Sequence, residues 1–211
     1  MNKKTAVVTG ASSGIGKVIY EGLKDEGFHV IGVSRRGPNF HMNLSKPLNM
    51  DFPFTGVTTL IDLLVNCAGA LHLDEHRVER YIMDVNFWGT WEVIQNLLPQ
   101  FSAGACVINI ASISGMRADD ETPIYAAAKA ALISLTKSFA KQYAGIYRFN
   151  CISPGFYKTN LVPGETPQEL IDTIPMGREE EPERLFPVVK MIYETEYMTG
   201  SNIVVDGGLL L

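Results

Sequence analysis

The chain begins with an apolar run, a glycine-rich turn and an amphipathic helix pattern in direct succession. The run is TAVVT from Thr5, the turn is GASSG from Gly10, and the helix pattern follows to about Leu23. A strand followed at once by a helix buries its faces best in a layered sheet, where right-handed crossovers join parallel strands. The start of the sequence therefore favours an α/β fold.

The same alternation continues along the chain. Further β-rich runs begin at His29 (HVIGVS), Asp62 (DLLVNCAG), Ala105 (ACVINIAS), Tyr147 (YRFNCIS) and Asn202 (NIVVDGG). Most are apolar for about four consecutive residues, as in strands covered on both faces. Longer helical patterns cover about residues 78–101 and 125–143. We predict one Rossmann-type domain over residues 1–211, with a doubly wound parallel sheet.

Composition excludes several classes of protein. Apolar residues make up 46% of the 211 residues and charged residues 19%, as in an ordinary folded domain. The formal net charge is −5 and the basic residues are scattered, which argues against binding of nucleic acid or anionic membranes. No run approaches the roughly 18 to 20 apolar residues of a membrane span. The first apolar run is too short for a signal peptide.

The sequence contains three cysteines, Cys67, Cys106 and Cys151. They are far apart and form no C-x-x-C pair, so we expect free thiols in a reducing compartment, and hence a cytoplasmic protein. His72 and His76 have a spacing that can bind a metal. We interpret them instead as lining the turn after NCAG, facing solvent or substrate, and expect no metal site.

Gly10, Gly14 and Gly16 have the spacing G-x-x-x-G-x-G. Glycines let the backbone approach a pyrophosphate closely, and the free N–H groups and dipole at a helix start favour its negative charge. A tight strand-to-helix turn without a ligand is the alternative. The amphipathic helix that follows favours dinucleotide binding, for which the candidate residues are Gly10, Ser12, Ser13, Gly14, Ile15 and Gly16.

The second β-rich run ends in Ser34, Arg35 and Arg36. Sites for NAD usually have an acidic residue here that binds the 2′-hydroxyl of the ribose. Guanidinium groups instead suit a 2′-phosphate, through bidentate hydrogen bonds and stacking on adenine. We therefore predict NADP(H) in preference to NAD(H). The alternative is that both arginines are solvated loop charges.

Tyr125 and Lys129 lie four residues apart in the stretch PIYAAAKAAL, where most other residues are alanine. This spacing places them on one face of a helix. A positive charge about 4 Å from the phenol, at an effective dielectric of about 20, contributes roughly 4 kcal/mol, or at most about three pKa units before burial opposes it. We therefore expect a lowered pKa that suits Tyr125 to acid/base chemistry.

Seven segments, in order, resemble the short-chain dehydrogenase/reductase family over nearly the whole chain. They are TGASSGIG (cofactor loop), NCAG (N-N-A-G), VNFWG (V-N-x-x-G), NIAS (catalytic-serine strand), YAAAK (Y-x-x-x-K), SPGFYKT (P-G segment and threonine) and TGSNIVVDGG (last strand and turn). The resemblance implies an NADPH-dependent oxidoreductase that interconverts a carbonyl and a secondary alcohol. A non-catalytic NADP(H)-binding sensor is the alternative, and an intact set of catalytic residues argues against it.

The resemblance also implies a role for each matching residue. Tyr125 would be the general acid in reduction and the base in oxidation, and Ser112 would hydrogen-bond the same substrate oxygen. Lys129 would hold the nicotinamide ribose, and Asn86 would support a proton relay through Lys129. Ser114 does not match the family spacing. The remaining cofactor contacts implied are Asn43, Leu44, Asn66, Ala68, Gly69, Pro154, Gly155 and Thr159.

The sequence departs from the family pattern at several positions. Asn43 stands where an aspartate usually contacts adenine, Cys67 replaces the second asparagine of N-N-A-G, and Tyr157 replaces a common valine or isoleucine. Residues 43–60 are too few for the usual full helix, so we expect a shortened crossover between the third and fourth strands. A compact, partly apolar segment at about 159–184 would form the substrate lid.

The resemblance finally implies a homo-tetramer or homo-dimer, built from the two long helices and the C-terminus. The apolar residues 209–211 suit burial at such an interface. The substrate expected is a small carbonyl compound or alcohol, whose identity the sequence leaves open.

Overall fold

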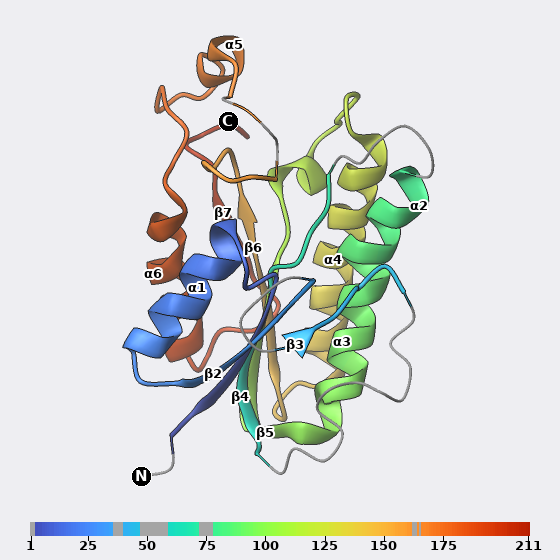
Figure 1. The fold of residues 1–211 in the computed structure, drawn as a ribbon, viewed down its shortest axis with the longest axis vertical. Coiled ribbons are helices and arrows are strands. Elements are labelled where there is room, and N and C mark those ends of the chain that lie inside the picture. The colour runs from blue at the N-terminus through green and yellow to red at the C-terminus, as the bar shows by residue number, and fades with distance from the viewer. Residues whose placement is uncertain (1–2, 36–39, 47–58, 72–77, 162–163, 165) are drawn as a thin grey trace.

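The computed structural model describes residues 3–35, 40–46, 59–71, 78–161, 164 and 166–211 (Figure 1). Within these residues the strands form one seven-stranded sheet of order β3-β2-β1-β4-β5-β6-β7, and every neighbouring pair is parallel. The strands are β1 (Thr5–Thr9), β2 (His29–Ser34), β3 (Phe40–His41), β4 (Ile61–Asn66), β5 (Phe101–Ile110), β6 (Arg148–Pro154) and β7 (Asn202–Val205). This is the predicted Rossmann-type α/β fold.

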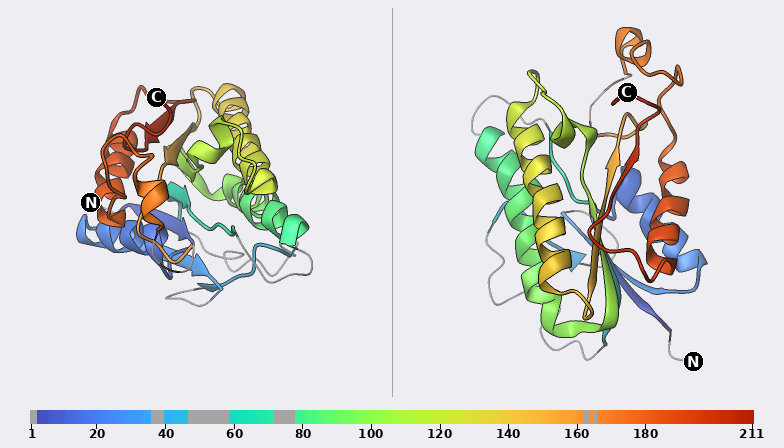
Figure 2. Two further views of the ribbon diagram at one scale, coloured as in Figure 1. Left: turned by 90° about the horizontal axis from the view of Figure 1, so that it is seen from above. Right: turned by 180° about the vertical axis from the view of Figure 1, so that it is seen from behind.

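Helices cover both faces of this sheet, as Figure 2 shows. One layer contains α1 (Gly14–Asp25) and α6 (Phe186–Glu194), and the other contains α2 (Val78–Met83), the π-helix η1 (Asp84–Trp88), α3 (Gly89–Leu97) and α4 (Pro123–Gln142). Short helices are η2 (Leu98–Gln100), η3 (Ile113–Met116), α5 (Gln168–Ile171) and η4 (Pro182–Leu185).

The side chains of successive strand residues point to opposite faces of the sheet, which explains why the strands are continuously apolar. Val8 and Leu63 pack in the cluster beneath α1 and α6, whereas Val7 and Leu64 pack in the cluster beneath α3 and α4. All four side chains are fully buried. Because side chains alternate along a strand, a sheet with helices on both faces needs apolar residues at every position.

The order of the strands fixes where a ligand can bind. β1 pairs with β2 on one side and with β4 on the other, so the chain changes direction across the sheet between these two neighbours. Clefts in open α/β sheets form at such a point, beyond the carboxyl ends of the strands. The glycine-rich turn follows β1 and the NCAG segment follows β4, so both lie at this edge.

The connection between β2 and β3 is short. β3 contains only Phe40 and His41, which pair in parallel with Val33 and Ser34. Residues 35–39 alone join the two strands, which is far fewer than the dozen or more of a helical crossover. The expected shortening between the third and fourth strands falls mostly on residues 47–58, outside the described residues.

The predicted helix over residues 78–101 ends one residue earlier and is not regular. It consists of α2, η1, α3 and η2, and Phe101 is already the first residue of β5. Sequence reasoning started this strand at Ala105, which was wrong because Ser102 to Gly104 interrupt the apolar run. The pairing of β4 with β5 shifts register between Ile61 and Leu63, which accommodates the additional residues of β5. Phe101 itself is buried in the core.

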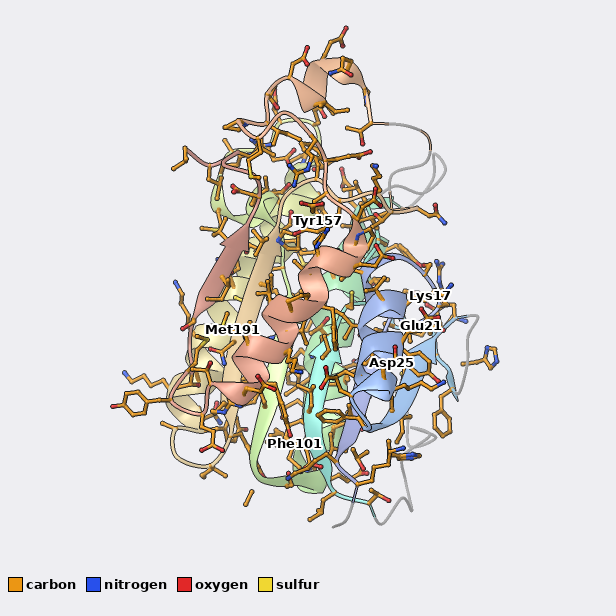
Figure 3. The ribbon with its side chains drawn as sticks, turned by 90° about the vertical axis from the view of Figure 1, so that its left-hand side faces the viewer. Lys17, Glu21, Asp25, Phe101, Tyr157 and Met191 are labelled. Carbon is orange, nitrogen blue, oxygen red and sulfur yellow. The ribbon has the colours of Figure 1, made fainter. Side chains whose placement is uncertain are left out.

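Residues 156–185 cross above the sheet edge and include the predicted lid. Tyr157 forms an isolated parallel bridge with Glu180, and the Met176 N–H donates to the Gly207 carbonyl at 3.1 Å. Figure 3 shows Tyr157 beside the upper end of α6, while Lys17, Glu21 and Asp25 lie along α1. Among the described residues, no helix is long and apolar enough to cross a membrane.

Candidate active site

The glycines of the first turn are required by close backbone packing. Gly10 has φ of 70°, and a Cβ there would lie 2.9 Å from the Ala68 Cα. A Cβ on Gly16 would lie 2.3 Å from the Gly10 carbonyl oxygen. Larger residues at either position would push the turn away from the NCAG segment or from the helix start. The turn is therefore held close to both.

The start of α1 has the properties of an anion site. Ser13 is the N-cap residue, and its hydroxyl makes no capping hydrogen bond with the described residues. The first turn, all of it described, contains no acidic residue, and Ser12 and Ser13 are exposed. Unsatisfied N–H groups and the helix dipole favour a negative group at such an end. Gly14 and Ile15 open this helix, as predicted for a pyrophosphate site.

A threonine that sequence reasoning missed joins the two halves of this edge. The Thr9 hydroxyl oxygen accepts hydrogen bonds from the backbone N–H groups of Cys67 at 3.0 Å and Ala68 at 3.1 Å. Thr9 is the last residue of β1 and is buried. A buried polar residue at the end of an apolar strand was the available signal, because such a group must find a partner.

The far side of the cleft is closed by the segment after β6. The Gly155 N–H donates to the Val205 carbonyl at 3.0 Å, and a Cβ on Gly155 would lie 2.7 Å from the Asp206 Cα. Pro154 ends β6, and the Thr159 side chain lies 3.3 Å from where a Cβ on Gly14 would be. Of the predicted residues 154, 155 and 159, Thr159 therefore lies against the glycine-rich turn.

At the end of β2, the predicted residues differ in their surroundings. Ser34 is 8% exposed, and its Oγ has no hydrogen-bond partner within the described part of the chain. Arg35 is exposed, and its guanidinium donates to the Tyr81 hydroxyl of α2 at 3.0 Å. Arg36 lies outside the described residues. One unsatisfied hydroxyl and one guanidinium therefore remain at the position where the sequence predicted a 2′-phosphate.

The two residues predicted to contact adenine are already engaged in other contacts. The Asn43 Oδ1 accepts from the Ser45 N–H at 3.1 Å and from the Ser45 hydroxyl at 2.8 Å. The Leu44 side chain is buried in the core beneath α3. Among the described residues, the Asn43 amide nitrogen and the backbone of this turn remain for a ligand, so cofactor binding by Asn43 and Leu44 stays a prediction.

Tyr125 and Ser112 lie on adjoining elements. Tyr125 is in the first turn of α4 and 7% exposed, and Ser112 is the N-cap residue of η3, just after β5. The Ser112 hydroxyl oxygen accepts from the Ser114 N–H at 3.1 Å, and the hydroxyl also hydrogen-bonds with Tyr125. The Ser114 backbone thereby orients the Ser112 hydroxyl. Ser114 is thus a neighbour of the predicted catalytic serine and not a second candidate for that role.

Burial raises the pKa of Tyr125 to about 12, and hydrogen bonding with the Ser112 side chain acts in the opposite direction. The expected lowering by Lys129 is therefore wrong for this structure. The Lys129 Nζ lies 5.5 Å from the centre of the Tyr125 ring and donates to the Ile110 carbonyl at 2.9 Å. The ammonium group thus contacts the ring and the backbone, while the phenol loses the solvation of its charged form.

Lys129 is itself perturbed by burial. It is 4% exposed, and desolvation lowers its pKa to about 8, opposed by the nearby Cys67 thiol. Burial also raises the pKa of Cys67 to about 12, opposed by the charge of Lys129. The thiol is consequently protonated at neutral pH and a poor nucleophile. Cys67 lines the site as a small neutral group beside Lys129.

Asn86 is fully buried in the π-helix η1. Its Nδ2 donates to the carbonyls of Ala70 at 2.7 Å and Ile82 at 2.8 Å. A Cβ on Gly69 would lie 3.1 Å from the Asn86 Oδ1 and 3.8 Å from the Lys129 Nζ. Gly69 thus leaves space between the amide and the ammonium. Single π-helical turns often occur at functional sites, where they redirect a side chain.

Comparison with known proteins identifies the family. A family model described as enoyl-(acyl carrier protein) reductase matches residues 55–210. Carbonyl reductase family member 4 of Xenopus tropicalis is 32% identical over 232 residues, covering 99% of this chain and 98% of that protein. The chain belongs to the short-chain dehydrogenase/reductase family. It is accordingly an NAD(P)-dependent oxidoreductase of CH–OH and C=O groups.

Solved structures of other short-chain dehydrogenases/reductases have the same fold. Ligand-free aldohexose dehydrogenase of Thermoplasma acidophilum is 29% identical and superimposes with a TM-score of 0.85, over 99% of this chain and 94% of that one. A 4-hydroxyisoleucine dehydrogenase complexed with NADH is 26% identical, with a TM-score of 0.88 over 98% of each chain. These names show that members of one fold act on different alcohols.

In this short-chain dehydrogenase/reductase, the structure gathers the four predicted catalytic residues at one edge of the sheet. Asn86 comes from η1, Ser112 from the end of β5, and Tyr125 and Lys129 from α4. All three cysteines are free, as predicted. Among the described residues, no group of three or more His, Cys, Asp or Glu side chains could hold a metal ion. His72 and His76 lie outside the described residues.

Proposed function

We propose that this protein is an NADPH-dependent carbonyl reductase or alcohol dehydrogenase in which Tyr125 is the general acid and base. The observation that carries the proposal is the convergence of Ser112, Tyr125 and Lys129 beside the glycine-rich turn. A buried phenol, a neighbouring hydroxyl and a buried ammonium are the groups that carbonyl reduction needs.

The site fits a dinucleotide. The uncapped start of α1 suits a pyrophosphate, and Ser34 offers a hydroxyl without a partner among the described residues. When bound, the nicotinamide supplies the hydride for reduction or accepts it in oxidation. Pro154, Gly155 and Thr159 would hold its nicotinamide end, and Asn66, Ala68 and Gly69 its adenosine ribose.

The chain's own residues would manage the proton. With a pKa near 12, the Tyr125 phenol is protonated at neutral pH and can donate to the oxygen of a bound carbonyl. Ser112 would donate a second hydrogen bond to that oxygen, since its own oxygen is already held by the Ser114 N–H. Lys129 and Asn86 would return a proton to Tyr125 through the space beside Gly69.

A preference for NADP(H) is supported by charge at the end of β2. Arg35 is a cation at the ribose end of the site, and the position after β2 carries no carboxylate that would repel a 2′-phosphate. The Tyr81 hydroxyl holds the Arg35 guanidinium at 3.0 Å, which limits its freedom before a ligand binds. Family membership leaves this choice open, since one relative is complexed with NADH.

The substrate proposed is a small carbonyl compound or its alcohol, covered by the lid at about residues 159–184. Ile174 in this lid is buried, whereas Met176 is 61% exposed. The assembly proposed is a homo-dimer or homo-tetramer in the cytoplasm. Trp88 and Trp91 support it, because they form an exposed edge-to-face aromatic pair at the start of α3.

The first experiment is a fluorescence titration of the protein with NADPH and, separately, with NADH. We expect tighter binding of NADPH, followed by NADPH oxidation when a panel of aldehydes and ketones is added. Binding of NADPH without turnover of any compound would favour the non-catalytic sensor. Binding of neither nucleotide would overturn the proposed function.

A further inference from the structure

A chain of buried side-chain hydrogen bonds joins two strands of the sheet to α4. The Asn66 Nδ2 donates to the Asn109 Oδ1 at 2.8 Å, and the Asn109 Nδ2 donates to the Thr136 Oγ1 at 2.9 Å. Thr136 donates in turn to the Leu132 carbonyl at 2.8 Å. Asn66 is 2% exposed, and Asn109 and Thr136 are fully buried. The chain therefore runs from β4 through β5 into α4 away from solvent.

The hydrogen-bond donors and acceptors of these side chains allow the network only one arrangement. A threonine hydroxyl has a single proton, and the Leu132 carbonyl can only accept. Thr136 must therefore act as acceptor toward Asn109, which presents its NH₂ to α4 and its carbonyl oxygen to Asn66. The Asn66 Oδ1 has no partner among the described residues. The two hydrogen bonds of the Asn109 side chain are therefore the part of the network that fixes the position of the elements it joins.

The network acts close to the reacting groups. Asn109 directly precedes Ile110, whose carbonyl accepts from the Lys129 ammonium at 2.9 Å, and β5 then leads to Ser112. Thr136 lies on the same helix as Lys129, about two turns further along. Two polar contacts thus join β5 to α4, one at Lys129 and one at Thr136. Together they determine how far α4 lies along β5.

Near Tyr125, alanines form part of the buried face of α4. Ala126 and Ala128 are buried, and α4 approaches η3 so closely that a Cβ on Gly115 would lie 2.6 Å from the Ala130 nitrogen. Helices keep their relative position by packing the ridges of one into the grooves of the other, and alanines make only low ridges. Leu132 and Ile133 pack further along the same helix. The directional hydrogen bond at Thr136 adds to this packing in setting the register of α4.

We propose that Thr136 is a positioning residue for the reaction: through Asn109 it fixes α4 along β5 and so keeps Tyr125 beside Ser112. This inference rests on the proposed function of the site. Thr136 acts through the helix and is separated from the phenol by the helical turns between them.

The test compares Thr136→Val with Thr136→Ser. Valine has the shape of threonine but leaves the Asn109 NH₂ without an acceptor, whereas serine keeps the hydroxyl. We expect Thr136→Val to lower kcat about 10- to 100-fold, since displacement of a reacting group by about 1 Å can cost 10²-fold. The KM for NADPH should change less than about threefold, and Thr136→Ser should restore kcat to within about threefold.

A purely structural role predicts a different result. Thr136→Val would then lower the melting temperature while kcat, measured well below that temperature, stayed within about twofold of wild type, and the inference would be overturned. If Thr136→Val does not fold, Thr136→Cys replaces it, because a thiol keeps most of the volume and is only a weak acceptor. The same fall in kcat with little change in KM is expected.

Failure of the proposed function is recognised separately. If wild type binds NADPH but reduces no carbonyl compound, the proposed function fails, and the positioning role is then judged from crystal structures of wild type and Thr136→Val. A displaced Tyr125 hydroxyl relative to Ser112 in the variant supports the inference. An unchanged position of both side chains overturns it.

Discussion

The two ends of the cleft differ in how far they are organised before any ligand binds. At the chemical end, Asn86, Tyr125 and Lys129 are all buried, and the amide and the ammonium are hydrogen-bonded to the backbone. At the adenosine end, Arg35 and Asn43 are exposed and the strand beside them has two residues. The fold thus fixes the groups that must act on bonds and leaves the nucleotide contacts adaptable.

The two ends should therefore differ in how turnover and cofactor binding respond to substitution. Substitutions at the chemical end should reduce turnover strongly and binding little, because in the proposed mechanism these groups would act on the reacting oxygen. Substitutions at the adenosine end should change cofactor affinity and selectivity by smaller factors, because several weak contacts each contribute a small part of the binding free energy. Five predictions test this difference between the two ends.

The largest effect is expected for Tyr125→Phe. Loss of the phenol removes the proposed general acid, whose contribution is typically 10²- to 10⁴-fold, so kcat should fall by about 10³-fold. NADPH affinity, measured by fluorescence titration, should stay within about threefold. Turnover near the wild-type rate would remove Tyr125 from the mechanism and, with it, the contrast between the two ends.

Ser112→Ala and Ser114→Ala form a matched pair. Ser112 should donate to the substrate oxygen, so its loss should lower kcat about 10²-fold. Ser114 contributes its backbone N–H, which alanine retains, so Ser114→Ala should keep kcat within about threefold. Steady-state kinetics of the two variants decide the point, and a larger effect at Ser114 would reverse the assignment.

Lys129→Met should lower turnover by less than Tyr125→Phe does, and should stabilise the protein at pH 7. Burial lowers the pKa of Lys129 from 10.5 to about 8, so the unfolded state binds more protons between these values and stability rises with pH there. Below pH 8 the buried charge costs roughly 3 kcal/mol, and loss of the hydrogen bond to Ile110 offsets about 1 kcal/mol. A net gain of about 2 kcal/mol is expected.

Urea unfolding at pH 7 and at pH 10 measures this effect. The gain should be present at pH 7 and mostly gone by pH 10, where wild type has also lost the charge. Lys137→Met is the control, since Lys137 lies on the same helix and is exposed. An equal gain in both variants, or one that persists at pH 10, would contradict a buried charge.

Arg35→Ala should change cofactor selectivity. A hydrogen bond to a charged group contributes about 1.5 to 3 kcal/mol, so NADPH binding should weaken roughly 10- to 100-fold while NADH binding changes less than about twofold. Arg80→Ala is the control, because Arg80 is an exposed cation on the neighbouring helix α2. Equal losses for both nucleotides would reject a role at the 2′-phosphate.

The smallest effect is expected for Asn43→Ala. The Asn43 Oδ1 is already occupied by Ser45, which leaves the amide nitrogen as the side chain's free hydrogen-bonding group. NADPH affinity should fall less than about threefold, as measured in the same titration. A loss of tenfold or more would show that the turn rearranges on binding, and the adenosine end would then be less adaptable than proposed.

Features that depend on residues close in sequence were predicted well, whereas features that depend on long-range packing were missed. The glycine-rich turn and the pairing of Tyr125 with Lys129 on one helix depend on residues close in sequence, and both were predicted. The order of motifs also located Ser112 and Asn86. The interrupted helix after Val78 and the early start of β5 were missed, because core packing of Phe101 outweighed the local pattern.

The sequence by itself determined the fold class and the groups available for chemistry, since periodicity and motif spacing act over a few residues. Only the tertiary structure decided how those groups behave. Burial, and not a neighbouring charge, sets the pKa of Tyr125, and core packing buries the Leu44 side chain. Asn109 and Thr136, distant in sequence, become partners only when β5 and α4 pack together, because hydrogen bonding between side chains requires that packing.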